Sequence, residues 1–431
     1  MFLNPQPATR STTSPDSTAT RRCVALGLLA SAVAAGTVLA GASSAFAQSA
    51  ADRVAQDVAK VNDAYLMGPK AASELGCTIA WQSLVPLPNG PKITLVSASP
   101  DGILALNSRN EISLVRPSTG DRAWTASAAQ QVDRVLSAEI VQVLTRDGQE
   151  PRVMVTTDTV AYGLDFKDGA SLLRGRFRHV PSTAPIVVGR GIVFGSRGGQ
   201  VAWFDCATGF DMSAYTVDGP YGKSPIVAAP TLGDGVIVAG SSEGTVVGLD
   251  AVSGASLWRK SLLGGVSARP AIANGVAFVA SQDQYLYAFD LGSGVTLWKY
   301  FTQTPLETSP FPAGSVVLQD IPGEGLVAFT QNPEGQIGGE VRWKKKDLPG
   351  APIGTARLRG ADAVLLWCSK GRKVTMVDLA NGDVVGTVEL PKVEHLEADS
   401  LEAGGFVAWS SDGRILRLSP AQSAAAAAPK G

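Results

Sequence analysis

The chain has 431 residues, of which 45% are hydrophobic and only 17% charged, with 47 Gly and 26 Pro. This length supports a large buried core, and few charges with many Gly and Pro favour short strands and tight turns over an all-helical fold. The formal net charge of -1 excludes a global electrostatic attraction to nucleic acid or anionic lipid. We therefore expect a partner to be recognised locally, and no nucleic acid among the partners.

An uncharged apolar segment near the N-terminus has the layout of a secretory signal peptide. Arg21 and Arg22 precede the apolar residues 24–40, and residues 45–47 form a small-x-small cleavage site. The sequence thus predicts a signal peptide over residues 1–47 and a periplasmic or secreted protein without stable membrane insertion after cleavage. A retained membrane anchor is the alternative, and the arginine pair leaves both Sec and Tat export open.

The segments on either side of the main body differ from it. Residues 48–76 are expected to form an N-terminal helix and linker, because Val54, Val58 and Val61 recur at helical spacing. The Ala-rich residues 420–431 are expected to be a disordered tail. Three cysteines follow the signal segment and are expected to be buried free thiols, with one disulfide as the alternative. They are Cys77, Cys206 and Cys368.

Two neighbouring stretches, residues 244–258 and 284–298, reveal an internal repeat. Both place Asp, Gly and Trp at the same offsets: Asp250, Gly254 and Trp258 in the first, and Asp290, Gly294 and Trp298 in the second. Hairpin turn signals of the Asp-Gly and Asn-Gly type precede each stretch. The unit therefore predicts four strands, in which Asp and Gly form a tight turn and Trp packs between neighbouring sheets.

The same register extends along the chain with a spacing of about 43 residues, the period of a four-stranded propeller blade. The Asp position of the repeat is occupied by Asp165, Asp205 and Asp378 in three further units, and by Arg116 and Gly335 in two others. The Trp position is occupied by Trp124 and Trp343 in two further units, and by Leu173, Ser213 and Gly386 in three others. We expect an all-β fold: an eight-bladed β-propeller of four-stranded blades over residues 77–419, closed by an N-terminal strand at residues 79–81.

One stretch carries the complete pattern A-x-D-x-x-x-G-x-x-x-W, from Ala288 to Trp298. This pattern resembles the PQQ-like repeat of the quinoprotein-alcohol-dehydrogenase-like β-propellers. That superfamily contains both enzymes and non-catalytic scaffolds, so the fold does not choose a function. Its enzymes hold a quinone beside calcium, usually against a vicinal disulfide, and this sequence has no Cys-Cys pair. The near-minimal blades are more similar to the BamB-type members, although their lipid-acceptor Cys is missing here.

The resemblance implies an exported, non-catalytic and monomeric propeller scaffold that binds protein partners, with outer-membrane assembly proteins as candidates. It assigns no catalytic, cofactor or metal residues. Two alternatives stay open: a PQQ-dependent dehydrogenase, and a propeller that binds a small ligand or a polysaccharide at the mouth of its channel.

Candidate binding residues lie around the loops that join the fourth strand of one blade to the first strand of the next. These loops ring one mouth of the channel, and Arg and Tyr often anchor protein interfaces. The candidates are Arg174, Arg176, Arg178, His179, Tyr221, Lys223, Arg269, Glu307, Arg357 and Arg359. Ordinary exposed loop residues are the alternative for each of them.

Two charged clusters stand apart from the repeat. On a strand, His395, Glu397 and Asp399 would share one face, which indicates either a divalent-ion site or a solvated blade entrance. The run of lysines at residues 344–346 indicates either protection of an outer edge strand or a contact with an acidic partner.

Overall fold

The computed structural model describes residues 64–88, 90–146, 148–219, 222–333, 335, 337–358 and 360–421. The chain divides into two units, Met1–Gln56 and Asp57–Gly431, and the described residues all belong to the second. The expected signal peptide, residues 48–63 of the expected N-terminal helix and linker, and residues 422–431 of the expected tail lie outside the described residues. No helix within the described ranges is long and apolar enough to span a membrane.

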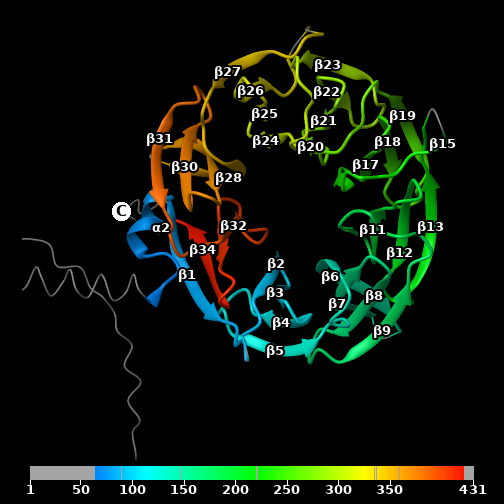
Figure 1. Cartoon of the computed structure of the whole chain (residues 1–431), viewed down its shortest axis with the longest axis vertical. Helices are drawn as coiled ribbons and strands as arrows, with labels where there is room; N and C mark the ends of the chain where they lie inside the picture. The colour runs from blue at the N-terminus through cyan, green and yellow to red at the C-terminus, as the bar shows by residue number, and fades with distance from the viewer. Residues whose placement is uncertain are drawn as a thin grey trace, which may run out of the picture. The chain divides into compact units, whose positions relative to one another are not determined.

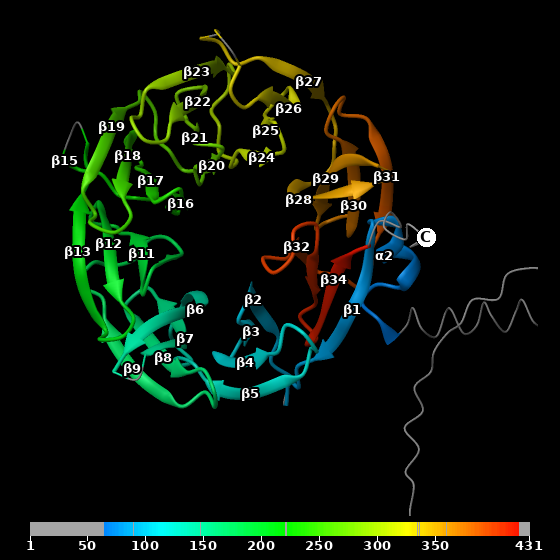
Figure 2. The same cartoon turned by 180° about the vertical axis from the view of Figure 1, so that it is seen from behind.

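The described residues fold into eight four-stranded antiparallel sheets that follow one another around a ring (Figure 1). In the first seven blades the strand order follows the sequence, from the innermost strand to the outermost (Figure 2). The prediction of an all-β, eight-bladed propeller is therefore confirmed.

Blades 1 to 4 have the following strands. They are β2 (Ile93–Ser99), β3 (Gly102–Asn107), β4 (Glu111–Val115) and β5 (Arg122–Ser127); β6 (Val135–Thr145), β7 (Gly148–Thr157), β8 (Val160–Asp165) and β9 (Ser171–Arg176); β10 (Ile186–Val188), β11 (Gly191–Gly195), β12 (Gln200–Asp205) and β13 (Phe210–Thr216); and β16 (Thr231–Gly233), β17 (Val236–Gly240), β18 (Thr245–Asp250) and β19 (Ser256–Ser261). A two-stranded hairpin, β14 (Asp218–Gly219) with β15 (Gly222–Lys223), lies between blades 3 and 4.

Blades 5 to 7 continue the same pattern. Their strands are β20 (Ala271–Ala273), β21 (Val276–Ala280), β22 (Tyr285–Asp290) and β23 (Thr296–Phe301); β24 (Phe311–Ala313), β25 (Val316–Ile321), β26 (Gly325–Thr330) and β27 (Val341–Lys345); and β28 (Ala351–Leu358), β29 (Ala361–Cys368), β30 (Lys373–Asp378) and β31 (Val384–Glu389).

Blade 8 combines the two ends of the described chain. Its inner strands are β32 (His395–Ala398), β33 (Phe406–Trp409) and β34 (Arg414–Pro420), and its outermost strand is β1 (Cys77–Leu84). Strand β1 pairs antiparallel with β34, from Cys77 opposite Pro420 to Leu84 opposite Arg414. The ring is thus closed by an N-terminal strand, as predicted, because the first described strand completes the sheet formed by the last three.

The core lies between neighbouring blades, because the middle strands of each blade are covered on both faces. In blade 5, for example, Trp298 is 0% exposed and packs with Phe278 and Phe329. Cys77 and Cys206 are buried free thiols, and Cys368 is a half-buried free thiol.

The repeated Asp closes the turn between the third and fourth strands. In blade 4, Asp250 accepts hydrogen bonds from the Ser253 amide at 2.7 Å and the Ser253 hydroxyl at 2.6 Å. Gly254 then adopts a φ of 70°, a conformation that favours glycine. Blade 5 repeats these bonds with Asp290 and Ser293. The turn therefore depends on the spacing seen in the sequence.

Where an outer strand carries the repeated Trp, this residue joins the strand to the next blade. Its indole Nε1 donates a hydrogen bond to the main-chain oxygen one residue after the Asp position of the following blade, and we call this bond the tryptophan latch. The latches join Trp81 to Pro117, Trp124 to Phe166, Trp258 to Leu291, Trp298 to Gln331 and Trp343 to Leu379, at 2.7–2.9 Å. A buried donor is thus satisfied at each of these junctions.

The latch corrects one predicted position in blade 6. Trp298 bonds to Gln331, so Thr330, the last residue of β26, occupies the Asp position. Gly335, which the repeat register suggested, lies instead in a longer turn between β26 and β27. The register misplaced this position because the turn of blade 6 is longer than those of blades 4 and 5.

Other residues hold the junctions where the repeat lacks its Trp. At the blade 3–4 junction, Trp203 of β12 donates to the Ala251 oxygen at 3.0 Å in place of Ser213. At the blade 2–3 junction, Arg152 donates to the oxygens of Cys206 and Ala207 at 2.7 and 3.1 Å.

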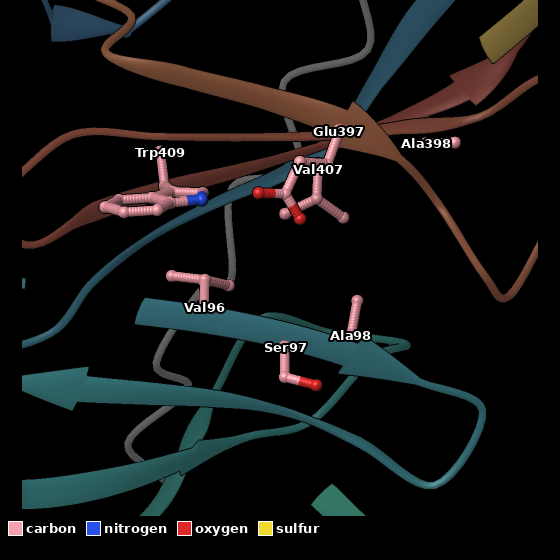
Figure 3. A pocket seen from close by; sticks show the side chains of 7 residues that line it. All are labelled: Val96, Ser97, Ala98, Glu397, Ala398, Val407 and Trp409. Carbon is pink, nitrogen blue, oxygen red and sulfur yellow. The ribbon is translucent and has the colours of Figure 1, made fainter. Parts of the chain in front are cut away.

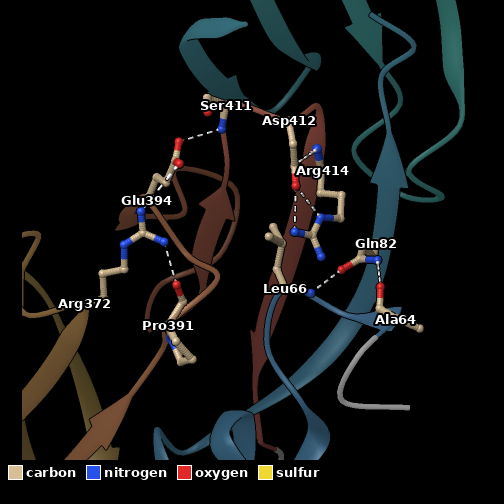
Figure 4. Close-up of polar contacts among 9 residues, drawn as sticks. All are labelled: Ala64, Leu66, Gln82, Arg372, Pro391, Glu394, Ser411, Asp412 and Arg414. Atoms are coloured by element: carbon tan, nitrogen blue, oxygen red, sulfur yellow. Dashed lines mark hydrogen bonds and ion pairs between the residues drawn. The ribbon is translucent and has the colours of Figure 1, made fainter. Parts of the chain in front are cut away.

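At the junction between blades 7 and 8, the short helix α2 (Pro69–Glu74) contacts β31 and β1. Leu66 and Met67, just before it, are buried in the same cluster as Met376 and Val388. The side chain of Gln82 ties this segment to β1 by accepting from the Leu66 amide at 2.7 Å (Figure 4). The N-terminal segment therefore covers the junction where Gly386 replaces Trp.

Candidate functional site on the inter-blade loops

The inter-blade loops join the outermost strand of one blade to the innermost strand of the next. They contain Arg178, His179, Lys223, Arg269 and Glu307, and Arg176 is the last residue of β9 before such a loop. Tyr221 and Arg359 lie outside the described residues.

Two candidates do not lie in these loops. Arg174 is inside β9, where its guanidinium lies 5.8 Å from the centre of the Tyr162 ring. Arg357 lies near the end of β28, an eight-residue strand. The inter-blade loop joins the other end of this strand, so Arg357 is far from that loop. The sequence placed both in loops because β9 and β28 extend beyond the strand ends that the repeat suggested.

The loop between blades 2 and 3 is fixed by polar contacts at both ends. The Arg178 amide donates to the Asp211 carboxylate of β13 at 2.7 Å. Farther along, the Ser182 hydroxyl contacts the Ile226 oxygen at 2.5 Å. The exposed side chains of Arg176 and Arg178 are thus carried by an ordered segment.

The hairpin between blades 3 and 4 carries Lys223 on its second strand. The main-chain oxygen of Asp218 accepts hydrogen bonds from the Thr245 hydroxyl at 3.2 Å and from the Arg259 guanidinium. Both partners belong to blade 4, so the hairpin is braced against that blade. Lys223 is exposed on this support.

Arg269 belongs to a polar group near the inner strands. Its Nε donates to the Thr231 hydroxyl at 3.0 Å, and burial lowers the pKa of Arg269 while the charge of Glu139 opposes that change. Glu139 lies on β6 and accepts from the Ser97 hydroxyl at 3.4 Å. Burial raises the pKa of the Glu139 carboxyl to about 7. Arg269 is nevertheless exposed, so it stays accessible to a partner while it bonds to Thr231.

The same loops expose apolar side chains that the sequence prediction did not include. Leu263 is 100% exposed and Val132 is 89% exposed, and Val180 and Val227 are also exposed. Each belongs to a different inter-blade loop, from blade 1 to blade 5. The sequence could have indicated that Leu263 is exposed, because it lies beside Gly264-Gly265 in a turn outside the blade strands. We define the loop surface as Val132, Arg176, Arg178, Val180, Lys223, Val227 and Leu263.

The acidic stretch near the end of the chain is divided among separate contacts. Glu394 accepts from the Ser411 amide at 2.8 Å and pairs with Arg372 at 3.6 Å (Figure 4). Asp399 is buried and pairs with Arg417 at 2.6 Å, and the His395 ring stacks on Trp409. Within the described ranges, no three His, Cys, Asp or Glu side chains form a group that could hold a metal ion.

The lysine run lies on the outermost strand of blade 6. Lys344 pairs with Glu324 at 2.5 Å, and Lys345 pairs with Asp383 of blade 7 at 2.7 Å. Both charges have acidic partners within the ring, which supports the interpretation as an outer edge strand.

Eight four-stranded blades, joined by Asp turns and tryptophan latches, define this chain as a β-propeller of PQQ-like repeats. The family model described as "Outer membrane protein assembly factor BamB" matches residues 71–300 and 242–400, so the chain belongs to this family.

Two solved structures share the fold at low sequence identity. BamB from Moraxella catarrhalis matches with a TM-score of 0.54 and 18% identity, over 80% of this chain and 99% of that chain. The computationally designed Ika8 protein matches with a TM-score of 0.56 and 15% identity, over 78% of this chain and 99% of that chain. No curated protein matches the chain.

Proposed function

We propose that this chain is an exported, non-catalytic scaffold that binds a protein partner in outer-membrane protein assembly. The observation that carries the proposal is the family match over residues 71–400, whose description names an assembly factor. The family's propeller is also the fold of quinone-dependent enzymes, so turnover of an alcohol or sugar with added quinone and calcium would contradict the non-catalytic part.

The loop surface supports binding of a protein. Protein interfaces combine an apolar centre with arginine anchors, and this surface offers both on loops that the blades hold in place. Arg176 and Arg178 make the surface basic at the loop between blades 2 and 3, whereas other inter-blade loops also expose Asp218 and Glu307. The partner segment that contacts the loop of Arg176 and Arg178 is therefore expected to be acidic and apolar.

The test uses the full-length chain, tagged and purified, to capture proteins from detergent-solubilised envelopes of its own cells. Identification of outer-membrane assembly proteins by mass spectrometry, with at least tenfold enrichment over the tag alone, is the expected result. The double variant R176E/R178E and the variant L263D are each expected to lower this capture about tenfold, since each removes an anchor or an apolar contact.

Arg357→Glu is the matched control, because it reverses an exposed charge near the far end of β28. It is expected to capture as much partner as the unmodified chain. Equal capture by all three variants would contradict the loop surface as the binding site, and capture of no assembly protein would contradict the proposed role.

A further inference from the structure

A cavity of about 180 Å³ lies between blade 8 and blade 1, at the inner strands (Figure 3). Residues 96–98 of β2 form one wall; Glu397 and Ala398 of β32, with Val407 and Trp409 of β33, form the other. In Figure 3, Val96 and Ala98 point toward the cavity, whereas the Ser97 side chain points away. The cavity is larger than the engineered cavity of about 150 Å³ that holds benzene, so it has room for one six-membered ring.

Trp409 brings an unused hydrogen-bond donor to this cavity. Its side chain is only 4% exposed, and its Nε1 has no hydrogen-bond partner among the described residues. Six other tryptophans in the ring donate their Nε1 to a main-chain oxygen. The Trp409 ring is fixed by His395, whose ring stacks on it with centres 3.8 Å apart and planes at 7°. A buried donor without a partner is unusual and needs an explanation.

Glu397 brings an unused acceptor to the same wall. His395 pairs with Trp409 and Glu397 pairs with Val407 across β32 and β33, so the four side chains share the face of blade 8 that meets blade 1. Partial burial raises the pKa of the Glu397 carboxyl although the residue is exposed on one side, and within the described residues this carboxyl has no hydrogen-bond or ion-pair partner. In Figure 3, the indole nitrogen and the carboxylate lie on neighbouring sides of the cavity.

These two groups select the chemistry of a ligand. A cation would satisfy Glu397 but offers no acceptor to Trp409, and an anion would be repelled by Glu397. Neutral hydroxyl groups can accept from the indole and donate to the carboxylate. The remaining side chains of the lining, Val96, Ala98, Ala398 and Val407, are apolar, but most of the surface that the cavity exposes is polar, which suits the hydroxyl groups of a ligand.

We propose that this cavity is a binding site for a single sugar ring, with Trp409 as the donor and Glu397 as the acceptor that position it. The site is separate from the loop surface, and it does not depend on the proposed role in assembly.

The first experiment follows the indole N–H signals of the full chain, which has eight tryptophans, after ¹⁵N labelling of tryptophan. D-glucose, D-galactose and N-acetyl-D-glucosamine are added separately. At least one of them is expected to shift the Trp409 signal in a saturable way and to leave the latch signals in place. The Trp409 signal is assigned as the one that disappears in Trp409→Phe.

The second experiment measures the affinity of the sugar that binds by calorimetry. Trp409→Phe is expected to weaken binding about three- to tenfold, and Glu397→Gln about tenfold or more, since the latter loses a bond to a charged acceptor. The matched control, Trp343→Phe, removes a latch indole far along the ring and is expected to bind within about twofold of the unmodified chain.

Methylammonium and acetamide serve as a cationic probe and an amide probe. If neither variant weakens sugar binding, or if no sugar shifts the Trp409 signal, the proposal is overturned and the cavity holds only water. It is also overturned if methylammonium or acetamide shifts this signal and the sugars do not.

Discussion

The outer rim of the ring and its inner wall at blades 8, 1 and 2 satisfy their polar groups to different degrees. On the rim, indole donors of the outermost strands meet a main-chain oxygen of the next blade, and at the blade 2–3 junction the Arg152 guanidinium does so from the second strand. On the inner wall, Trp409 Nε1 has no described partner, and partial burial raises the pKa of the Glu139 and Glu397 carboxyls. The rim therefore stabilises the ring, whereas the inner wall retains unused polar groups of the kind that bind ligands.

The largest expected effect comes from removing the rim of blade 8. A chain without residues 1–85 loses the pairing of β1 with β34 and the latch of Trp81. It is expected to lose its single cooperative unfolding transition, measured by circular dichroism during heating, because an open ring exposes two blade edges. A chain without only residues 1–47 is the control. An unchanged transition in the larger deletion would disprove closure by β1.

The inner wall is expected to make stability depend on pH through Glu139. Burial raises its pKa from 4.5 to about 7, so between these values the folded chain holds a proton that the unfolded chain has lost. The free energy of unfolding therefore falls as pH rises through this window, by on the order of 3 kcal/mol. Glu139→Gln is expected to remove this part of the dependence, measured by urea unfolding between pH 4.5 and 8. An identical pH profile in the variant would contradict a desolvated Glu139.

The blade junctions can be tested where they depart from the repeat. Arg152→Met keeps the length of the side chain but loses the bonds to the Cys206 and Ala207 oxygens. We expect it to lower the free energy of unfolding by about 1.5–3 kcal/mol, the range for a bond to a charged group. Arg122→Met, at an exposed arginine bonded to Thr125, is the control and is expected to change stability by less than about 0.5 kcal/mol. Equal effects of the two variants would show that Arg152 does not hold the blade 2–3 junction.

The sequence predicted the blade count and the closing strand because the Asp, Gly and Trp positions recur at a nearly constant spacing. It did not predict how blades without the repeated Trp are joined. Trp203 is on the third strand of its blade and Arg152 on the second, so their common role depends on positions in space that no fixed spacing reveals.

The polar inner wall was also only partly predictable. Alternation along a strand indicated that His395 and Glu397 share a face, and they do. It could not indicate that Asp399 would pair with Arg417, or that Trp409 would stack on His395 with its nitrogen unsatisfied. Those contacts depend on the neighbouring strands and on blade 1.

The most direct test of the contrast between rim and inner wall compares Trp343→Phe with Trp409→Phe by urea unfolding at pH 7. Both variants lose part of a buried indole ring, so the difference between them reports the latch. Trp343→Phe also loses the bond to Leu379 and is expected to lower the free energy of unfolding by about 1–2 kcal/mol more than Trp409→Phe, which removes a donor that has no described partner. A loss in Trp409→Phe as large as that in Trp343→Phe would contradict the account.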